Sequence, residues 1–167
     1  MLARVAGFLW MFVALGCGAG APPPAEQDWN AQVQAVRAGE AEEIQVEANE
    51  VGDDQVAMLE GQLTLRRLSL GRARITGEGL ERIAELQTLE MLRLVGAAAL
   101  DDQSLRHLGE MQGLEHLMLY DVPITDAGLE HLHGLHALES FYFSGTAITD
   151  DGIAELSRAL PDLHVHW

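Results

Sequence analysis

The chain contains no lysine, and this absence removes two kinds of chemistry. Its ten basic residues are all arginine, so neither the lysine of a phosphate-binding loop nor a Schiff-base lysine is available. Basic residues are also few, at 10 against 26 Asp and Glu, which gives a formal net charge of -16 at pH 7. Because an acidic surface repels phosphate backbones, we expect no nucleic-acid partner.

The motifs of common catalytic sites are missing as well. The chain has none of the patterns GxSxG, HExxH, CxxC or GxGxxG. The glycine-rich segment 71–79 lacks the spacing of a nucleotide-binding loop and indicates a turn between a strand and a helix. The sequence therefore predicts neither an enzyme nor a cofactor.

Cysteine occurs once, as Cys17, just after a short apolar run. Arg4 gives a positive start, and the eleven apolar residues 5–15 are too few to span a membrane but typical of a signal peptide. The small residue Gly16 before the cysteine resembles a bacterial lipobox, although Ala14 stands where that motif usually has Leu. The resemblance implies that Cys17 is lipid-modified and becomes the first residue of the mature protein, which would leave no free thiol.

Ordinary signal-peptide cleavage after Ala21 is the alternative, which Pro22 at the next position disfavours. The interpretation that follows is a signal peptide at 1–16 and a lipid-anchored flexible tether at 17–27, rich in Gly, Ala and Pro. We therefore expect an exported lipoprotein, held at a membrane of a bacterial cell envelope by the lipid on Cys17.

Pairs of apolar residues at i and i+2 recur along the rest of the chain every 24 or 25 residues. The pairs are Ile44 and Val46, Leu68 and Leu70, Leu92 and Leu94, Leu117 and Leu119, Phe141 and Phe143, and Val165 and Trp167. A fixed period of this length is typical of a solenoid of stacked repeats. One extra residue falls in the third repeat, within 95–103, where we expect a bulge between strand and helix.

Each apolar pair is followed by a turn and a second apolar patch. The best copies of this second part are 123–132 and 147–156, which share an Ile-Thr-Asp-x-Gly start. The Thr-Asp pair supplies a side-chain oxygen for the first N–H groups of a helix, and apolar residues at i and i+3 give that helix a buried stripe. Each repeat is therefore predicted to form a strand, a turn and a short helix.

These residues resemble the leucine-rich repeat, in the variety with Ile-Thr-Asp-x-Gly-Leu turns found in ribonuclease-inhibitor-like horseshoes and in many bacterial surface proteins. The resemblance covers about 43–167 and implies an α/β fold: a short right-handed solenoid of about five repeats with a parallel concave sheet. The usual turn Asn appears only as Asn49, so we expect an incomplete side-chain ladder between turns. The family's scaffold binds many different things, so the resemblance by itself names no ligand.

Both ends of the array need a cover. Trp29, Val33 and Val36 are spaced as the buried stripe of a helix, and Gly39 is a stop signal. We predict a capping helix at 28–39, within an N-terminal cap segment 28–42, and a final strand in which Leu163, Val165 and Trp167 close the other end.

Histidines and acidic pairs are the candidates for metal ligands. The pairs at 53–54, 101–102 and 150–151 are interpreted as helix-start charges at equivalent positions, with calcium as the less favoured alternative. His107 and His131 are expected to face solvent on the convex side. His116 and His164 should lie two strands apart, which is too far for one shared transition-metal ion. The sequence predicts no metal site.

Side chains that alternate with the buried pairs should together form the concave face of the sheet. Arg, Met and Tyr are enriched in the cores of protein interfaces, so we predict that this face binds a protein partner. We also expect the chain to be a monomer. The candidate binding residues are Arg67, Met91, Arg93, His116, Met118, Tyr120 and Tyr142. Two alternatives stay open: an envelope protein with a structural role and no specific ligand, and an enzyme that uses His116, Tyr120, His164 and His166.

Overall fold

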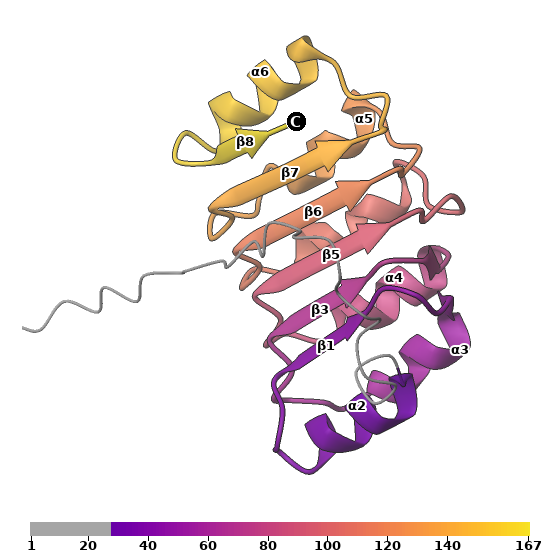
Figure 1. The fold of residues 1–167 in the computed structure, drawn as a ribbon. Helices are drawn as coiled ribbons and strands as arrows, with labels where there is room; N and C mark the ends of the chain where they lie inside the picture. The colour runs from indigo at the N-terminus through magenta and orange to yellow at the C-terminus, as the bar shows by residue number, and fades with distance from the viewer. Residues whose placement is uncertain (1–27) are drawn as a thin grey trace, which may run out of the picture.

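The computed structural model describes residues 28–167. The predicted signal peptide and tether, with Cys17, lie outside the described residues. Six parallel strands form one sheet in chain order, so each repeat adds its strand beside that of the preceding repeat (Figure 1). The strands are β1 Glu43–Val46, β3 Arg67–Leu70, β5 Met91–Val95, β6 His116–Tyr120, β7 Ser140–Ser144 and β8 His164–His166. Two shorter strands, β2 Val51–Gly52 and β4 Ala73–Arg74, pair with each other at the turns.

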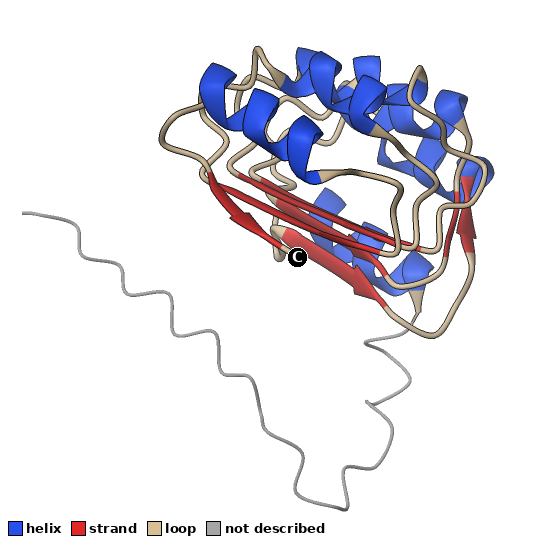
Figure 2. Cartoon of the chain, turned by 90° about the horizontal axis from the view of Figure 1, so that it is seen from above, coloured by secondary structure: helices blue, strands red, loops and turns tan. Residues whose placement is uncertain are grey.

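The helical segments between strands return the chain to the start of the next strand and form a layer on one side of the sheet (Figure 2), whereas α2 precedes β1. The α-helices are α2 Trp29–Arg37, α3 Asp53–Val56, α4 Gly77–Ala84, α5 Asp126–Leu129 and α6 Asp150–Ala159. Short 3-10 helices continue or replace them: η1 Ala57–Leu59, η2 Ser104–Arg106, η3 Leu108–Glu110 and η4 Glu130–Leu132. No described helix has the length and apolar character needed to cross a bilayer. We call the helical side of the molecule the convex side and the uncovered face of the sheet the concave face.

The predicted strand register is confirmed. Leu68 pairs with Leu92, Leu92 with Leu117, and Leu117 with Phe141, so each inward-pointing residue stacks on its equivalent in the next repeat. These side chains are fully buried in one continuous core that runs from Trp29 to Leu160. The stacking explains the fold, because a single repeat has no way to bury its own apolar face and its neighbours complete it.

The extra residue of the third repeat is accommodated between β5 and η2. Gly96 has a positive φ of 73°, but so do its counterparts Asp121 and Gly145 in the next two repeats, so the extra residue falls after Gly96, where Ala97 and Leu100 stay buried. The β5–β6 register is undisturbed, with Met91 opposite His116. This repeat has two 3-10 turns on the convex side where α4 and α6 are regular helices.

The two ends of the array differ. The predicted N-terminal helix is present as α2, with Asp28 accepting from the Asn30 amide at its start and Gly39 at a φ of 72° after its end. At the C-terminus, Leu163 and Val165 are partly buried against the core. Trp167 was also predicted to close this end, but it lies beyond β8 and is 80% exposed, with its ring centroid 6.4 Å from that of Phe143.

Successive repeats are tied together on the convex side by pairs of Thr and Asp. Each Asp carboxylate accepts from both the amide and the hydroxyl of a Thr 23 residues later, at 2.7 to 2.9 Å. The pairs are Asp53 with Thr76, Asp102 with Thr125, and Asp126 with Thr149. Each Thr hydroxyl also accepts from an amide of its own helix, as the sequence predicted. We call this set the Thr–Asp ladder.

The acidic pairs at 53–54, 101–102 and 150–151 were expected at equivalent positions of their repeats. The ladder shows that the pair at 101–102 is offset by one residue. Asp102, not Asp101, is the counterpart of Asp53, because the extra residue shifts the third repeat by one. These carboxylates also accept hydrogen bonds from the following repeat. The sequence predicted only that they lie at the start of their own helix. The turn Asn of the family pattern is missing from most repeats of this chain. The Thr–Asp ladder links the repeats at the helix starts instead.

Candidate binding groove

All seven predicted binding residues line one groove of about 840 Å³ on the concave face. They come from β3, β5, β6 and β7, whose outward-pointing residues lie side by side in register. One row across the strands contains Arg67, Met91, His116 and Ser140, and the next contains Ser69, Arg93, Met118 and Tyr142. The fold therefore brings together the residues that the alternation pattern selected.

Two arginines of the groove are already paired with carboxylates of β1 and the residue after it. Arg67 Nε lies 3.0 Å from Glu43 Oε2, and Arg93 Nη1 lies 2.8 Å from Glu47 Oε1. Arg93 also donates to Ser69 Oγ, which lies on the strand between, at 3.1 Å. These pairs hold both guanidinium groups in place and balance their charge at the β1 end of the sheet.

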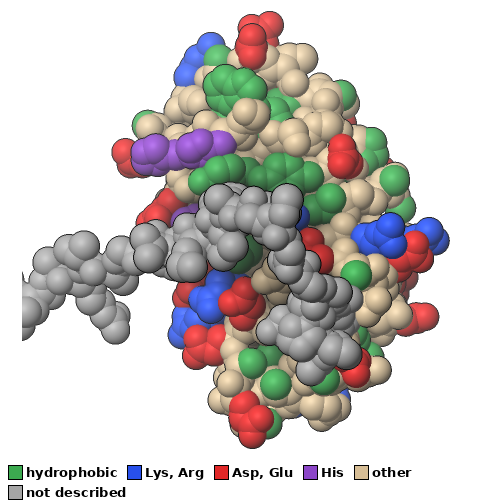
Figure 3. Space-filling model, in the orientation of Figure 1, with side chains coloured by type: hydrophobic (Ala, Val, Ile, Leu, Met, Phe, Trp, Pro, Cys, Tyr) green, Lys and Arg blue, Asp and Glu red, His purple; other side chains and the backbone are tan. Residues whose placement is uncertain are grey.

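Aromatic and sulfur-containing side chains dominate the other end of the groove, over β6 and β7, where Figure 3 shows hydrophobic side chains gathered. Met118, Tyr120 and Tyr142 are half-buried, and the Tyr142 ring stacks on His166 with ring centroids 4.4 Å apart. Arg93 stands 5.9 Å from the centroid of the Tyr120 ring. Burial raises the pKa of Tyr120 above its ordinary value of 10.0, against the opposing effect of Arg93, so the phenol stays protonated at neutral pH. It can therefore donate a hydrogen bond to a ligand.

Met91 lies on this face as predicted, but little of its side chain is accessible. It borders the groove but is only 4% exposed, in its row between Arg67 and His116. Met91 therefore supports the floor of the groove and offers a ligand little surface.

Four further residues line the groove that were not among the candidate binding residues, although alternation places one of them, Ser140, on this face. Ser140 lies between His116 and His164 in its row, and the others are Glu90, Glu115 and Glu139. The three glutamates recur with the repeat period immediately before β5, β6 and β7, so the period could have indicated them. Arg66, which also contacts Glu42, forms an ion pair with Glu90. The three glutamates give the groove a negative rim at the edge where the strands start.

The histidines fall into two groups. His116, His164 and His166 lie on the concave side in the predicted rows, and among residues 28–167 no three His, Cys, Asp or Glu side chains converge as a metal site. His107 was expected to face solvent, which is wrong: it is 8% exposed in the convex layer. Its counterpart His131, one repeat later, is half-buried.

Comparison with known proteins identifies the repeat. Residues 62–84 match the family model described as Leucine Rich repeat. No curated protein sequence matches the chain. An internalin of Listeria monocytogenes is similar in structure, with a TM-score of 0.59 and 20% identity over 80% of this chain. A leucine-rich-repeat protein of Leptospira interrogans has a TM-score of 0.53 and 18% identity over 81% of this chain.

The chain spans little more than a third of these two solved structures, 36% of the first and 39% of the second. At these identities the likeness concerns the fold. Together with the register, the core and the matched repeat, it shows that residues 28–167 form a leucine-rich-repeat solenoid of the α/β class.

Proposed function

We propose that the chain is a non-catalytic binding module that holds a protein partner in the groove of its concave face. The observation that supports this proposal most is the grouping of Met118, Tyr120 and Tyr142 as neighbours at one end of the groove. Outward-pointing strand positions need no apolar residue for folding, whereas half-buried aromatic and Met side chains provide much contact area in interfaces.

The charges of the groove describe the partner further. Arg67 and Arg93 are neutralised within the fold, and the acidic rim of Glu90, Glu115 and Glu139 borders the strand starts. A segment with an apolar or aromatic side chain for Met118 and Tyr142, flanked by basic residues for the rim, would complement this surface.

The second part of the proposal concerns location. The features of the N-terminal segment support an exported lipoprotein anchored in a bacterial envelope through Cys17. In this arrangement a tether would connect the membrane to the solenoid and leave the concave face accessible to a partner.

Site-specific photo-crosslinking tests the binding face directly. A benzophenone amino acid in place of Tyr142, in the full-length protein, should crosslink to a discrete partner, while the same amino acid at Arg158, which is exposed on the convex helix α6, should not. His107 is unsuitable as this control because it is buried.

Affinity measurements with the crosslinked partner then complete the test. Tyr142→Ala should weaken its binding by about 1–3 kcal/mol, the range of central Tyr anchors, and Arg158→Ala should leave it unchanged. Equal crosslinking or equal loss at the two positions, in folded proteins, would contradict the proposal. A protein with a purely structural role would give no discrete crosslink at either position.

A further inference from the structure

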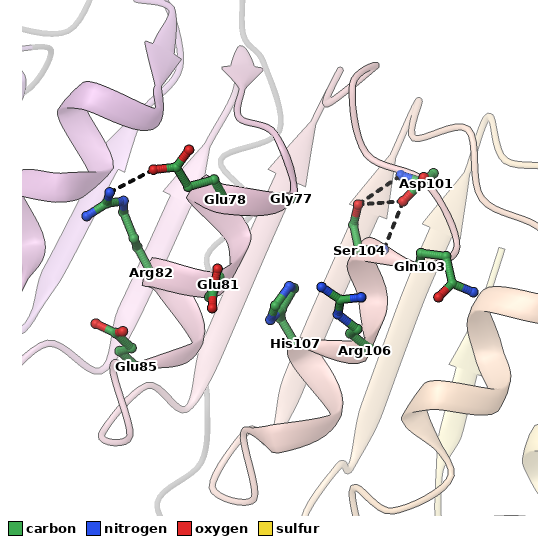
Figure 4. A pocket seen from close by; sticks show the side chains of 10 residues that line it. All are labelled: Gly77, Glu78, Glu81, Arg82, Glu85, Asp101, Gln103, Ser104, Arg106 and His107. Atoms are coloured by element: carbon green, nitrogen blue, oxygen red, sulfur yellow. Dashed lines mark hydrogen bonds and ion pairs between the residues drawn. The ribbon is translucent and has the colours of Figure 1, made fainter.

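A second cavity lies on the convex side, away from the concave groove. It is a cleft of about 670 Å³ between α4 and the turn that contains η2, and its lining includes Gly77, Glu81, Glu85, Asp101, Arg106 and His107 (Figure 4). None of these residues takes part in the concave groove. The cleft is therefore independent of the function proposed above.

The cleft coincides with a gap in the Thr–Asp ladder. Gly77 occupies the ladder position of Asp53 and Asp102, but it has no carboxylate to offer to the next repeat. Asp101 stands where the neighbouring repeats have the ladder Thr, and its carboxylate instead accepts from the amide and hydroxyl of Ser104, at 2.9 and 2.6 Å. Repeats two and three are thus not tied by a Thr–Asp pair at this point, where Gly77 packs against Ser104 and both residues line the cleft.

His107 gives this space a polar group in need of a partner. Its side chain is only 8% exposed, and neither ring nitrogen has a hydrogen-bond partner within residues 28–167. Figure 4 shows the ring pointing into the space between α4 and η2, close to Glu81. A nearly buried polar side chain that makes no hydrogen bond within the fold leaves its ring nitrogens to bond water or a ligand in the cleft.

The charges of the cleft indicate the sign of that ligand. Four carboxylates and two guanidinium groups line it, an excess of two negative charges. Glu78 and Arg82 neutralise each other across one turn of α4, at 2.8 Å, whereas Glu81 and Glu85 form no ion pair with any described residue. The hydrogen bonds from Ser104 lower the pKa of Asp101 and keep it ionised at neutral pH. The cleft therefore suits a cation.

The geometry favours an organic cation over a bare metal ion. Among the described residues no three His, Cys, Asp or Glu side chains converge closely enough to ligate one ion. The carboxylates instead stand on opposite walls, with Glu81 and Glu85 on α4 and Asp101 across the cleft beside η2 (Figure 4). Two positive groups separated by a short linker match this arrangement better than a single ion.

We propose that the convex cleft binds a small organic cation with two or more ammonium groups. One ammonium group donates to the unpaired ring nitrogen of His107 and to Glu81, and a second binds Asp101 on the opposite wall. The same pair of ammonium groups occurs in free polyamines and in peptides with two nearby lysines. The chain itself has no lysine, so no segment of another copy of it can supply them.

Titration calorimetry on the full-length protein at low ionic strength tests the proposal, with spermidine and an acetylated Lys-Ala-Ala-Lys peptide as separate probes. At least one probe should bind saturably, at one molecule per chain, and the tighter of the two identifies the source of the ammonium groups. Glu81→Gln should weaken binding about two- to fivefold, as expected for an exposed charge pair, and His107→Leu should also weaken it.

Matched controls are available because the repeats are in register. Glu130→Gln on η4 is the counterpart of Glu81→Gln two repeats later, and His131→Leu is the counterpart of His107→Leu. Both should leave binding unchanged. The proposal is overturned if neither probe binds saturably, if Glu130→Gln weakens binding as much as Glu81→Gln, or if Mg²⁺ displaces the probes at equal concentration. Glu81→Gln changes an exposed residue, so the test holds even if His107→Leu does not fold.

Discussion

The guanidinium of Arg93 on β5 lies 2.8 Å from the carboxylate of Glu47, which is 46 residues earlier in the chain and follows β1. Glu47 follows the first strand of the sheet and Arg93 belongs to the third, so the contact spans the strand between them. That strand is followed by Gly71, whose position in register with Glu47 leaves room for the contact. A link across three repeats thus depends on a small residue in the middle one.

The first prediction concerns this pair. Arg93→Ala and Glu47→Ala should show a coupling free energy of about 0.2–1 kcal/mol in a double-mutant cycle, because both side chains are partly exposed to solvent. Urea unfolding measures it, and the coupling should shrink at high salt. A coupling that is absent at low salt would contradict the contact.

A second prediction concerns Gly71. A Cβ atom there would come within 2.7 Å of the Glu47 Cα and 2.9 Å of its carbonyl oxygen, which are backbone atoms that cannot rotate away. Gly71→Ala should therefore destabilise the fold by about 1–3 kcal/mol. Gly134→Ala is the control, because a Cβ atom at Gly134 meets nothing within 4 Å. Equal thermal stability of the two variants would be inconsistent with this packing.

The strand register gives a third prediction. Leu117 is fully buried, so Leu117→Ala should cost about 2–5 kcal/mol by leaving a cavity. The next residue, Met118, points into the groove and is half-exposed, so Met118→Ala should cost about 1 kcal/mol or less. Thermal melts distinguish the two, and equal losses would mean that the alternation is wrong.

The Thr–Asp ladder leads to a fourth prediction, with a dependence on pH. Thr149→Val removes the helix cap and the hydrogen bond from the Thr149 hydroxyl to Asp126, while the amide bond remains, and should cost about 0.5–2 kcal/mol at pH 7. Ser157→Ala, at an exposed position on α6, serves as the control.

The hydrogen bonds from Thr149 lower the pKa of Asp126 below its ordinary value of 3.8. A carboxyl whose folded pKa is depressed stabilises the fold fully above the unfolded value and loses that contribution as the pH falls through the folded value. The stability difference between wild type and Asp126→Asn should therefore narrow below about pH 4. A difference that stays constant from pH 7 down to about pH 2.5 would speak against this role of the carboxylate.

The fifth prediction concerns the lipid anchor. Cys17→Ser should abolish incorporation of labelled fatty acid and release the protein from membranes, because the serine hydroxyl does not replace the thiol that is modified. The lipoprotein proposal fails if the wild-type protein carries no lipid and its mature N-terminus is Pro22.

The sheet could be predicted from the sequence because its determinants are local and periodic. The pairs around Leu92 and Leu117 fixed which residues point inward, and the groove residues on the other face follow from alternation alone. The burial of Met91 and of His107 was not predicted, because it depends on their neighbours in adjacent repeats, which the period does not encode.

Contacts between distant parts of the chain were not predicted for a different reason. The Arg93–Glu47 pair depends on how far a long side chain reaches across the sheet. The Thr–Asp ladder depends on the distance between helix starts, and the motif at 147–156 indicates only the helix cap. Repeats predict the positions of residues, whereas the pairing of their side chains requires coordinates.

The gap in the ladder at Gly77 also affects how the protein unfolds. In a solenoid, stability is close to a sum of the repeats and of the interfaces between neighbours, so one weak interface does not spread its effect along the array. The sheet and core continue through this point, but the convex side has one link fewer. Opening fluctuations should therefore concentrate at the junction of α4 and η2 and divide the array into an N-terminal and a C-terminal cooperative unit.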